Sequence, residues 1–429
     1  MKLRNLFLAS LAVCTMASCS KDDDGISGPQ EVDAYLSFAS TTDVMTKTSI
    51  EKPDDPDKGG TGKEAKIQSL TAYVFDESGK YVISKHVSLP DGTTESSGED
   101  FDAKDGSITT IKAIHVKVAK PTGSATTSAT KFQVLLLANM NELAPADLDA
   151  LKNEKTAAIT TFNEIGKSYL PMHSDVLTVA GLTPVKEETD GTKTHYLNWY
   201  KDNNSCVVSD TPTNGTHIAT APQGAAEVLL TRSISRVQFT SLESNFTGQY
   251  AGVTFKIDSI YLANVRNNAT VIGEENTEAA YFRGGPKEFA VIQKLIDPSA
   301  TVENSFVKKY ESLVLSNEGG LLDVNKLGFD KYINANQPRY TEEGYLTRLL
   351  ITGTLKDNGR DLGRKYFHIP LKLKDNVGNV MSNKFFKVIA TITGEGSPNP
   401  DEILENACIN FSIEVAPWEV IEQTEDDTN

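Results

Sequence analysis

The chain has 429 residues, 39% of them hydrophobic, and 42 Lys and Arg against 58 Asp and Glu give a formal net charge of −16. This length exceeds one ordinary core and indicates two or three domains. The acidic balance, without any long run of basic residues, argues against nucleic-acid binding. Apolar residues gather in short alternating runs, which predicts a folded chain rather than a disordered one.

The first twenty residues have the layout of a signal peptide. Lys2 and Arg4 form a positive start, residues 6–13 are apolar, and small residues lead directly to Cys19. A cysteine in that place is typical of a bacterial lipobox, in which Cys19 becomes the lipidated first residue of the mature protein. An ordinary signal peptide with a chance cysteine is the alternative. The sequence therefore predicts a signal peptide over residues 1–18 and a mature chain held at a membrane by lipid, without spanning it.

The residues after Cys19 indicate where such a lipoprotein goes. Lys21, Asp22, Asp23 and Asp24 resemble the acidic tag of Bacteroidota lipoproteins that face outward from the outer membrane. A solvated acidic linker is the plainer alternative. The tag favours a precursor lipoprotein of the outer membrane that is exposed at the cell surface.

Two further cysteines lie in the body of the chain. Cys206 and Cys408 are far apart and belong to no CxxC or Cys/His cluster, so they indicate neither a zinc site nor a redox site. One long-range disulfide between them is open, and two buried free thiols are the favoured interpretation.

Short runs with a period of two residues, separated by Pro, Gly and Asp, dominate the rest of the sequence and predict a mostly β fold. The expected strands of the first half are at residues 34–40, 66–76 and 131–140, and those of the second half begin near Glu227 and continue at 253–265, 346–355, 365–373, 385–393 and 408–420.

Helical periodicity is rare. Only residues 145–153 are expected to form a short helix, with Pro and Asp at its start. The polar stretch from Lys186 to Gly224 separates the two series of strands, which places a domain boundary near residue 225. The sequence thus predicts two β-sandwiches in tandem.

Sequence motifs of enzymes are missing. The six histidines stand singly, and there is no HExxH, no GxSxG and no phosphate-binding glycine loop. Adjacent carboxylates such as Asp54 and Asp55 carry little information in so acidic a chain. We expect no enzymatic activity, no metal and no cofactor.

Two segments near the ends of the chain stand out. Residues 53–66, PDDPDKGGTGKEAK, cannot bury apolar surface and predict an exposed, protease-sensitive linker, although a simple loop between strands is the alternative. Near the C-terminus, Ile409, Phe411, Ile413 and Val415 form an apolar stripe that resumes at Trp418 and Val420. An ordinary closing strand has the same pattern.

The layout resembles the fimbrillin family, the pilins of type V pili in Bacteroidales. The resemblance rests on residues 132–139 (FQVLLLAN), 230–239 (LTRSISRVQF), 383–400 (NKFFKVIATITGEGSPNP) and 410–420 (NFSIEVAPWEV). It implies two tandem transthyretin-like Greek-key β-sandwich domains after a lipoprotein signal peptide. The implied divisions are 1–18 (signal peptide), 19–47 (lipidated propeptide with the first strand), 48–225 (N-terminal domain) and 226–429 (C-terminal domain ending in a donor strand).

The resemblance also implies a function, namely a fimbrial shaft subunit that polymerises by donor-strand exchange into a surface fimbria for adhesion. A maturation protease removes the first strand, Ala34 to Thr41, and the C-terminal strand of another copy or of a related pilin replaces it. The donor residues are then Ile409, Phe411, Ile413, Val415, Trp418 and Val420. Well-known members are cut after Arg, but this chain has no Arg between Arg4 and Arg232, and Lys47 occupies the matching position.

Two other functions stay open. An anchor or accessory pilin keeps its lipid and donates only its C-terminus. A surface glycan-binding lipoprotein needs an exposed aromatic platform, for which residues 196–200 (YLNWY) are the one candidate cluster. Such a cluster is more often packed than sugar-binding.

Overall fold

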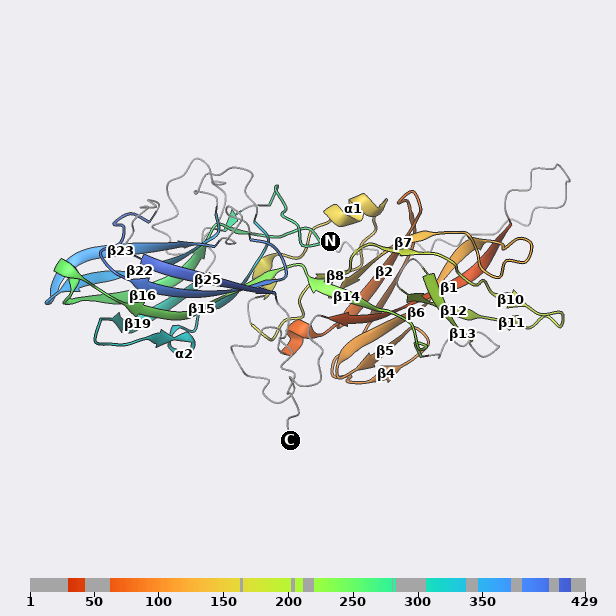
Figure 1. Cartoon of the computed structure of the whole chain (residues 1–429), viewed down its shortest axis with the longest axis horizontal. Coiled ribbons are helices and arrows are strands. Elements are labelled where there is room, and N and C mark those ends of the chain that lie inside the picture. The colour runs from red at the N-terminus through yellow and green to blue at the C-terminus, as the bar shows by residue number, and fades with distance from the viewer. Residues whose placement is uncertain are drawn as a thin grey trace, which may run out of the picture.

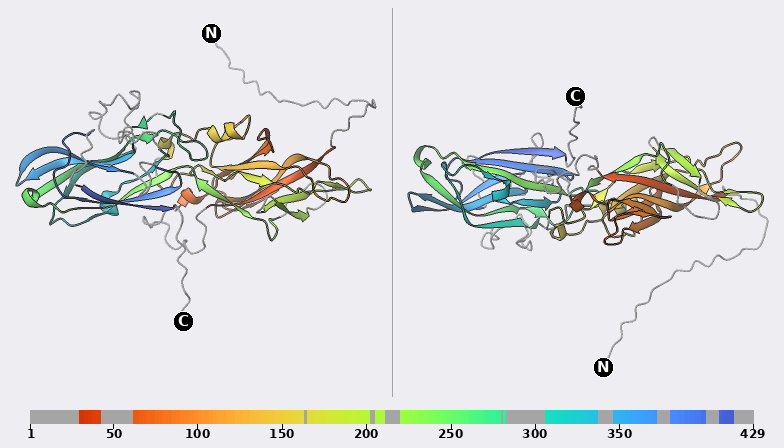
Figure 2. Two further views of the ribbon diagram at one scale, coloured as in Figure 1. Left: turned by 45° about the horizontal axis from the view of Figure 1, so that its top comes forward. Right: turned by 90° about the horizontal axis from the view of Figure 1, so that it is seen from below.

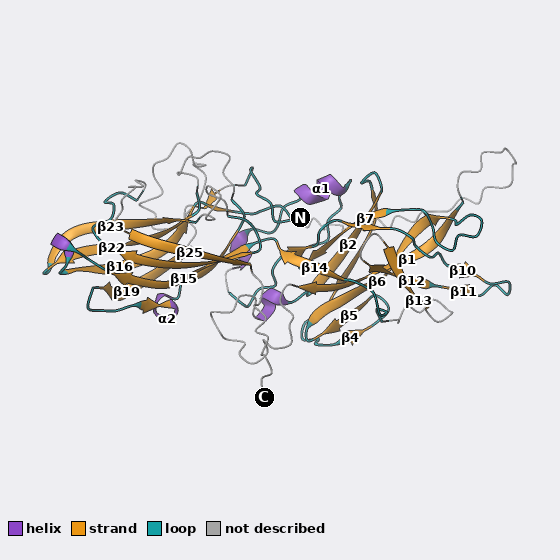
Figure 3. Ribbon diagram, viewed as in Figure 1, coloured by secondary structure: helices purple, strands orange, loops and turns teal. Residues whose placement is uncertain are grey.

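The structure is a computed structural model. It describes residues 30–42, 62–162, 165–201, 205–210, 220–279, 281–282, 306–336, 346–371, 380–400 and 409–417. β-strands dominate these residues and helices are few and short (Figure 3), which confirms the prediction of a mostly β chain. The strands form two lobes that lie end to end along the long axis of the molecule (Figures 1 and 2).

The first lobe holds the strands from β1 to β14. They are β1 (Glu31–Thr42), β2 (Ser69–Asp76), β3 (Tyr81–Ser88), β4 (Ser96–Ser97), β5 (Phe101–Lys104), β6 (Ser107–Ala119), β7 (Phe132–Ala138), β8 (Met172–His173), β9 (Leu177–Val179), β10 (Lys186–Glu187), β11 (Lys193–Thr194), β12 (Tyr196–Lys201), β13 (Ser205–Asp210) and β14 (Glu227–Arg232). The main sheet runs in the order β3-β2-β7-β8-β14-β1-β6-β5-β4, with β12 beside β1. Its core includes side chains of β1, β2, β6 and β7.

The second lobe is built from two sheets. Its elements are β15 (Ser235–Ser244), β16 (Val253–Ala263), β17 (Val265–Arg266), β18 (Tyr281–Phe282), β19 (Val307–Leu315), β20 (Leu322–Asp323), β21 (Asp330–Ile333), β22 (Arg348–Asp357), β23 (Arg360–Pro370), β24 (Lys384–Ile392) and β25 (Ile409–Pro417). One sheet runs β20-β15-β24-β25 with β21 beside β15, and the other runs β19-β16-β22-β23. Side chains from both sheets share one core, in which the Phe255 and Phe367 rings meet edge to face with their centroids 5.2 Å apart.

Short helical segments connect the strands. They are α1 (Leu148–Asn153), α2 (Val324–Leu327), η2 (Gly62–Ala65), η3 (Ile159–Phe162) and η4 (Gly248–Tyr250). The expected helix at 145–153 is present but begins later, because the Asp147 side chain caps it by accepting a hydrogen bond from the Ala150 N–H (2.8 Å).

One residue of the FQVLLLAN segment has a defined structural task. Asn139 ends β7 with a φ of 57°, a left-handed conformation that Asn tolerates better than most side chains. Its Oδ1 accepts from the Gln68 N–H (2.8 Å), and its Nδ2 donates to the carbonyls of Lys66 (2.9 Å) and Leu170 (2.8 Å). Asn139 thereby ties the end of β7 to the segments that lead into β2 and β8.

The region around residue 225 differs in detail from the expectation. Residues 186–224, expected to lie between the two series of strands and within the N-terminal domain, contain β10 to β13, and β12 pairs with β1 inside the first lobe. The run from Glu227, expected as one segment of the second series, breaks into β14 and β15, and β14 pairs with β1 and β8. We therefore place the change of lobe at Ser233. The transthyretin-like Greek-key type of the two sandwiches stays a prediction.

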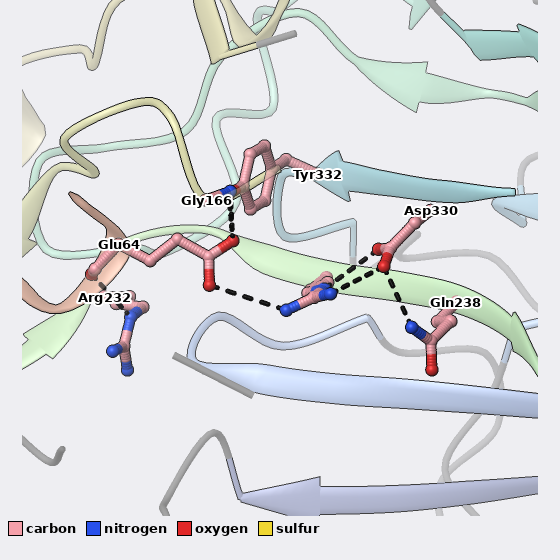
Figure 4. A network of polar contacts seen from close by, with 7 residues as sticks. Glu64, Gly166, Arg232, Gln238, Asp330 and Tyr332 are labelled. Carbon is pink, nitrogen blue, oxygen red and sulfur yellow. Dashed lines mark hydrogen bonds and ion pairs between the residues drawn. The ribbon is translucent and has the colours of Figure 1, made fainter. Parts of the chain in front are cut away.

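A buried carboxylate joins the two lobes (Figure 4). Glu64 lies in η2 and is fully buried. Its Oε1 accepts hydrogen bonds from the Gly166 N–H (3.1 Å) and from the Tyr332 hydroxyl. Its Oε2 lies 3.5 Å from Nη1 of Arg236 in β15. Burial, and next the Glu64 charge, raise the pKa of the Tyr332 hydroxyl, so Tyr332 keeps its proton and acts as a donor.

The rest of this cluster completes the pairing of the buried charges. Arg236 holds Asp330 through Nε (2.9 Å) and Nη2 (2.6 Å), and Gln238 donates to the same carboxylate (3.0 Å). Arg232 Nε donates to the Glu64 carbonyl (3.2 Å). Both arginines of the LTRSISRVQF segment therefore serve the lobe junction, where a carboxylate without a cation would be costly.

We predict that Glu64→Ala destabilises the folded chain by about 3 kcal/mol, because it leaves buried donors on Arg236, Tyr332 and Gly166 without their acceptor. Glu64→Gln keeps an acceptor and is expected to cost less. Chemical denaturation of the purified variants measures both.

Glu188→Ala is the matched control, because Glu188 forms an exposed ion pair with Lys186 (2.7 Å). Its effect should stay within about 0.5 kcal/mol. Equal stability of Glu64→Ala and Glu188→Ala would contradict the assigned role of Glu64.

Candidate functional site

The first strand lies inside the sheet of its lobe and is paired on both edges. β1 pairs antiparallel with β6 from Glu31 to Ala39, and its other edge pairs parallel with β12 at residues 35–37 and with β14 at residues 39–42. Removing β1 would leave N–H and C=O groups of three strands without their partners, and such groups are costly to bury unpaired. The position of β1 is therefore a groove that requires a strand.

The inward face of β1 is part of the core. Ala34, Leu36 and Phe38 have no solvent exposure and pack among core side chains of the first lobe. The alternation seen in the sequence at residues 34–40 is thus a true strand pattern, extended here to Glu31–Thr42. Full burial of such side chains is worth ~1.5–3 kcal/mol each for the larger two.

The outward face of β1 carries a polar clasp. Asp33 Oδ1 lies 2.5 Å from Lys117 Nζ and 2.7 Å from His115 Nε2, both on β6. The Tyr35 ring stacks between the rings of His115 (centroids 5.3 Å apart) and His195 (5.2 Å). The Lys117 ammonium, and after it His115, hold the pKa of Asp33 below its usual value. These contacts fix the N-terminal half of β1 on the sheet.

The predicted linker at 53–66 is corrected at its C-terminal end. Gly62–Ala65 form η2, in which Glu64 and Ala65 are buried. Gly62 has a φ of 66°, and a Cβ there would lie 2.6 Å from the Gly166 carbonyl oxygen, so glycine is required. Lys63 donates its N–H to the same carbonyl (3.0 Å), and its ammonium lies 4.7 Å from the Tyr169 ring centroid. Glu64 and Ala65 are therefore not part of an exposed linker, and residues 53–61 lie outside the described residues.

The C-terminal strand lies at the edge of its own lobe. β25 pairs antiparallel with β24 from Ile409 to Pro417. The register sets Ile409, Phe411 and Ile413 beside the core-facing Ile392, Ala390 and Val388. Yet Phe411 is 38% exposed, and Ile409 and Ile413 are only partly buried. The apolar stripe exists, but its own lobe covers it incompletely.

The segment that leads from β24 toward β25 is bound to the other sheet of the second lobe. Ser397 and Tyr366 of β23 exchange backbone hydrogen bonds of 2.8 and 2.9 Å. Glu395 pairs with Lys365 and accepts from the Tyr250 hydroxyl (2.7 Å). The chain is thus held in place up to this point, whatever partner β25 has.

Several predicted site residues lie outside the described part of the chain: Cys19, Lys21, Asp22, Asp23, Asp24, Lys47, Trp418 and Val420. Val415 is described by its backbone pairing with Phe386. The lipobox, the surface tag and the cleavage position therefore stay predictions.

The remaining sequence candidates have structural roles. Trp199 of the YLNWY cluster is fully buried, and its Nε1 donates to Ser209 Oγ (3.1 Å), so it offers no sugar platform. Cys206 is a free, partly buried thiol in β13, and burial raises its pKa to about 12. Cys408 lies outside the described residues.

The sequence analysis did not predict the contacts of Asp33 with His115 and Lys117, or the stacking of Tyr35 with His115 and His195. It also did not predict the ion pair of Glu64 with Arg236 at the lobe junction. The alternation His115-Val116-Lys117 was a signal for a strand with a polar outer face. Across the described ranges, no group of three or more His, Cys, Asp or Glu side chains is arranged to hold a metal ion. The same ranges contain no helix with the length and apolar character that crossing a membrane demands.

Known proteins share this arrangement. Residues 34–232 match the family described as major fimbrial subunit protein (FimA). The major fimbrium subunit FimA type-2 of Porphyromonas gingivalis is 22% identical over 458 residues, covering 99% of each chain. A protein provisionally named fimbrium tip subunit Fim1C, from Parabacteroides distasonis, is 24% identical over 312 residues, which cover 71% of this chain and 69% of the relative.

A solved fimbrilin (FimA) structure from Porphyromonas gingivalis W83 has the same fold, with a TM-score of 0.55, 18% identity and coverage of 91% of this chain and 99% of that one. The chain is thus similar, over residues 34–232 and to one relative over nearly its whole length, to the fimbrillin, or FimA, family of major fimbrial subunit proteins, a family of structural subunits and not of enzymes.

Proposed function

We propose that this protein is a shaft subunit of a cell-surface fimbria for adhesion and that it polymerises by donor-strand exchange after proteolysis. The carrying observation is the pair of strands at the two ends of the chain. β1 fills a two-sided groove in the first lobe, whereas β25 is a half-covered edge strand of the second. In this proposal β1 is removed from the groove, and β25, which has the same alternation of apolar and polar side chains, replaces it.

The steps follow from the pairing of these strands. A protease cuts between Thr42 and Gly62, with Lys47 as the proposed site, and β1 leaves together with the lipid on Cys19. The vacated groove exposes backbone groups of β6, β12 and β14. The β25 segment of a second copy, or of a related pilin, then pairs with them, as in other cases of β-augmentation.

Energetics favour exchange over an empty groove. The open groove has both unpaired backbone groups and an uncovered apolar core, each of which is unfavourable in water. Among the described residues of its own lobe β25 pairs on one edge with β24, and its stripe is partly exposed, so it loses less by leaving than it gains in the groove. In the groove the same strand gains two paired edges and full cover.

A second candidate function rests on the missing arginine. No Arg lies between Arg4 and Arg232, so a protease specific for Arg leaves β1 and its lipid in place. The protein is then an anchor or accessory pilin that keeps its lipid in the outer membrane and donates only its C-terminal strand.

We predict that the precursor is lipidated at Cys19. In cells fed a fatty-acid probe, the wild-type protein should be labelled and should be cleaved by protease added outside. Cys19→Ala should abolish the label and lower the surface exposure, and Cys14→Ala is the matched control. Labelling that persists in Cys19→Ala argues against a lipoprotein.

We predict that limited trypsin treatment of the folded precursor cuts after Lys47, with Lys52 and Lys58 as rival sites. Lys63 should resist, because its backbone and side chain are held against Gly166 and Tyr169. The fragment that ends at Lys47 should be released, while both lobes resist the protease. Mass spectrometry of the new N-terminus measures the site, and Lys47→Gln should move it to Lys52 or Lys58.

Mass spectrometry of the N-terminus of subunits recovered from fimbriae distinguishes the two candidate functions. A new N-terminus at or after Thr48 supports the shaft subunit. A subunit that still begins at Cys19 supports the anchor.

We predict that deleting residues 410–429 leaves a folded monomer that cannot polymerise. The deletion removes the partly buried Ile413 and the 38% exposed Phe411, and their loss should cost about 1–3 kcal/mol. Thermal unfolding measures the fold, and gels and electron microscopy of trypsin-treated protein measure the polymer. Polymers from the truncated chain would exclude β25 as donor, and an unfolded chain would indicate an ordinary closing strand.

A further inference from the structure

The three members of the β25 stripe whose side chains the structure describes read the same in both directions. Ile409, Phe411 and Ile413 form an Ile-Phe-Ile series at every second residue. If these residues take the inward places of Ala34, Leu36 and Phe38, the apolar fit is identical whichever way the incoming strand runs. Backbone pairing also gives no clear preference, because β1 pairs antiparallel with β6 on one edge and parallel with β12 and β14 on the other.

The outward face of β25 does have a direction. Its described residues are Asn410, Ser412 and Glu414, of which Glu414 alone is charged. In the second lobe the register sets Glu414 beside Lys387 of β24. The Glu414 carboxylate therefore lies beside a basic residue, Lys387, before any exchange.

The two ends of the groove differ in charge. At one end Asp33 of β1 contacts Lys117 (2.5 Å) and His115 (2.7 Å), and both of these residues stay on β6 when β1 leaves. At the other end Ala39 lies in register between Thr110 of β6 and the exposed Glu227 of β14.

Neither described residue in register with Ala39 is basic. Lys112 of β6 is fully buried and already forms an ion pair with Asp102 (2.7 Å). A carboxylate in the Ala39 place would therefore meet the like charge of Glu227, and a carboxylate in the Asp33 place would meet Lys117.

We propose that the donor strand runs in the direction opposite to β1, with Glu414 in the place of Asp33 and with Ile413, Phe411 and Ile409 in the places of Ala34, Leu36 and Phe38. This inference rests on the proposed strand exchange and specifies its direction and register. Lys117 and His115 form the recognition site for one acidic side chain of the donor. The groove thereby accepts strands that carry a carboxylate directly after the Ile-Phe-Ile series.

Cross-linking of assembled protein tests the direction. Trypsin-treated full-length chains are allowed to polymerise and are treated with a zero-length carbodiimide, and the cross-linked peptides are identified by mass spectrometry. The expected product joins Lys117 of one subunit to Glu414 of the next. In the opposite direction Glu414 lies at the Ala39 place, six residues and about 20 Å from the Asp33 place, which is too far for this bond.

Charge exchange tests the recognition site. Glu414→Lys should slow polymerisation about threefold to tenfold, since both groups are near the surface and such pairs are weak. Lys117→Glu, assayed after removal of β1, should do the same, and mixing it with a Glu414→Lys donor should restore the rate. Lys309→Glu makes the same charge change on exposed β19 and should have no effect.

The outcomes separate this inference from the function on which it rests. Polymers that lack the Lys117–Glu414 product and are insensitive to Glu414→Lys overturn the direction and register but keep strand exchange. Wild-type chains that never polymerise after loss of β1 overturn the exchange itself.

Discussion

Two-sided backbone pairing of one strand is the constraint on which the rest of the structure depends. β1 lies between β6 on one edge and β12 and β14 on the other, and its inward side chains are fully buried. A strand in this place belongs to the sheet by hydrogen bonding and to the core by packing. Such a strand can be exchanged for another of the same alternation, but its place cannot stay empty at low cost.

The second strand of the pair is suited to exchange for the opposite reason. β25 is bound on a single edge, and its apolar stripe faces the core side without being fully covered. The difference in burial between the two positions favours the proposed exchange, because the stripe of β25 passes from partial to full burial. The lobe junction stays within one fragment after the proposed cleavage, because Glu64 and Arg236 both follow the proposed cleavage segment in the sequence.

Local alternation predicted the strands that matter most for function. The segments expected at 34–40, 131–140 and 385–393 form strands near those bounds, and the described part of the segment expected at 408–420 forms β25 (Ile409–Pro417). Their period of two residues is a local property, so it is readable without the fold. The sequence did not predict that β14 belongs to the first lobe. The β pattern is continuous around Ser233, so it does not indicate that the residues before and after Ser233 join different sheets.

The sequence also did not predict contacts between residues that are far apart along the chain. Glu64 lies in a run that reads as a polar linker, and only the approach of Tyr332, Gly166 and Arg236 makes it a buried junction residue. The same holds for Asp33 and Lys117, which are 84 positions apart and meet through strand register. The lipobox, the surface tag and Lys47 were readable as motifs, and they stay predictions.

The bound segment at Glu395 and Ser397 sets a limit on the geometry of any assembly. The backbone bonds between Ser397 and Tyr366 hold the chain on β23, and Ile409 follows twelve residues later. A chain of that length spans at most about 40 Å when fully extended. In the proposed exchange the donated strand therefore begins within this radius of Ser397, so the connecting chain sets an upper limit on the distance between the second lobe of one subunit and the groove of the next.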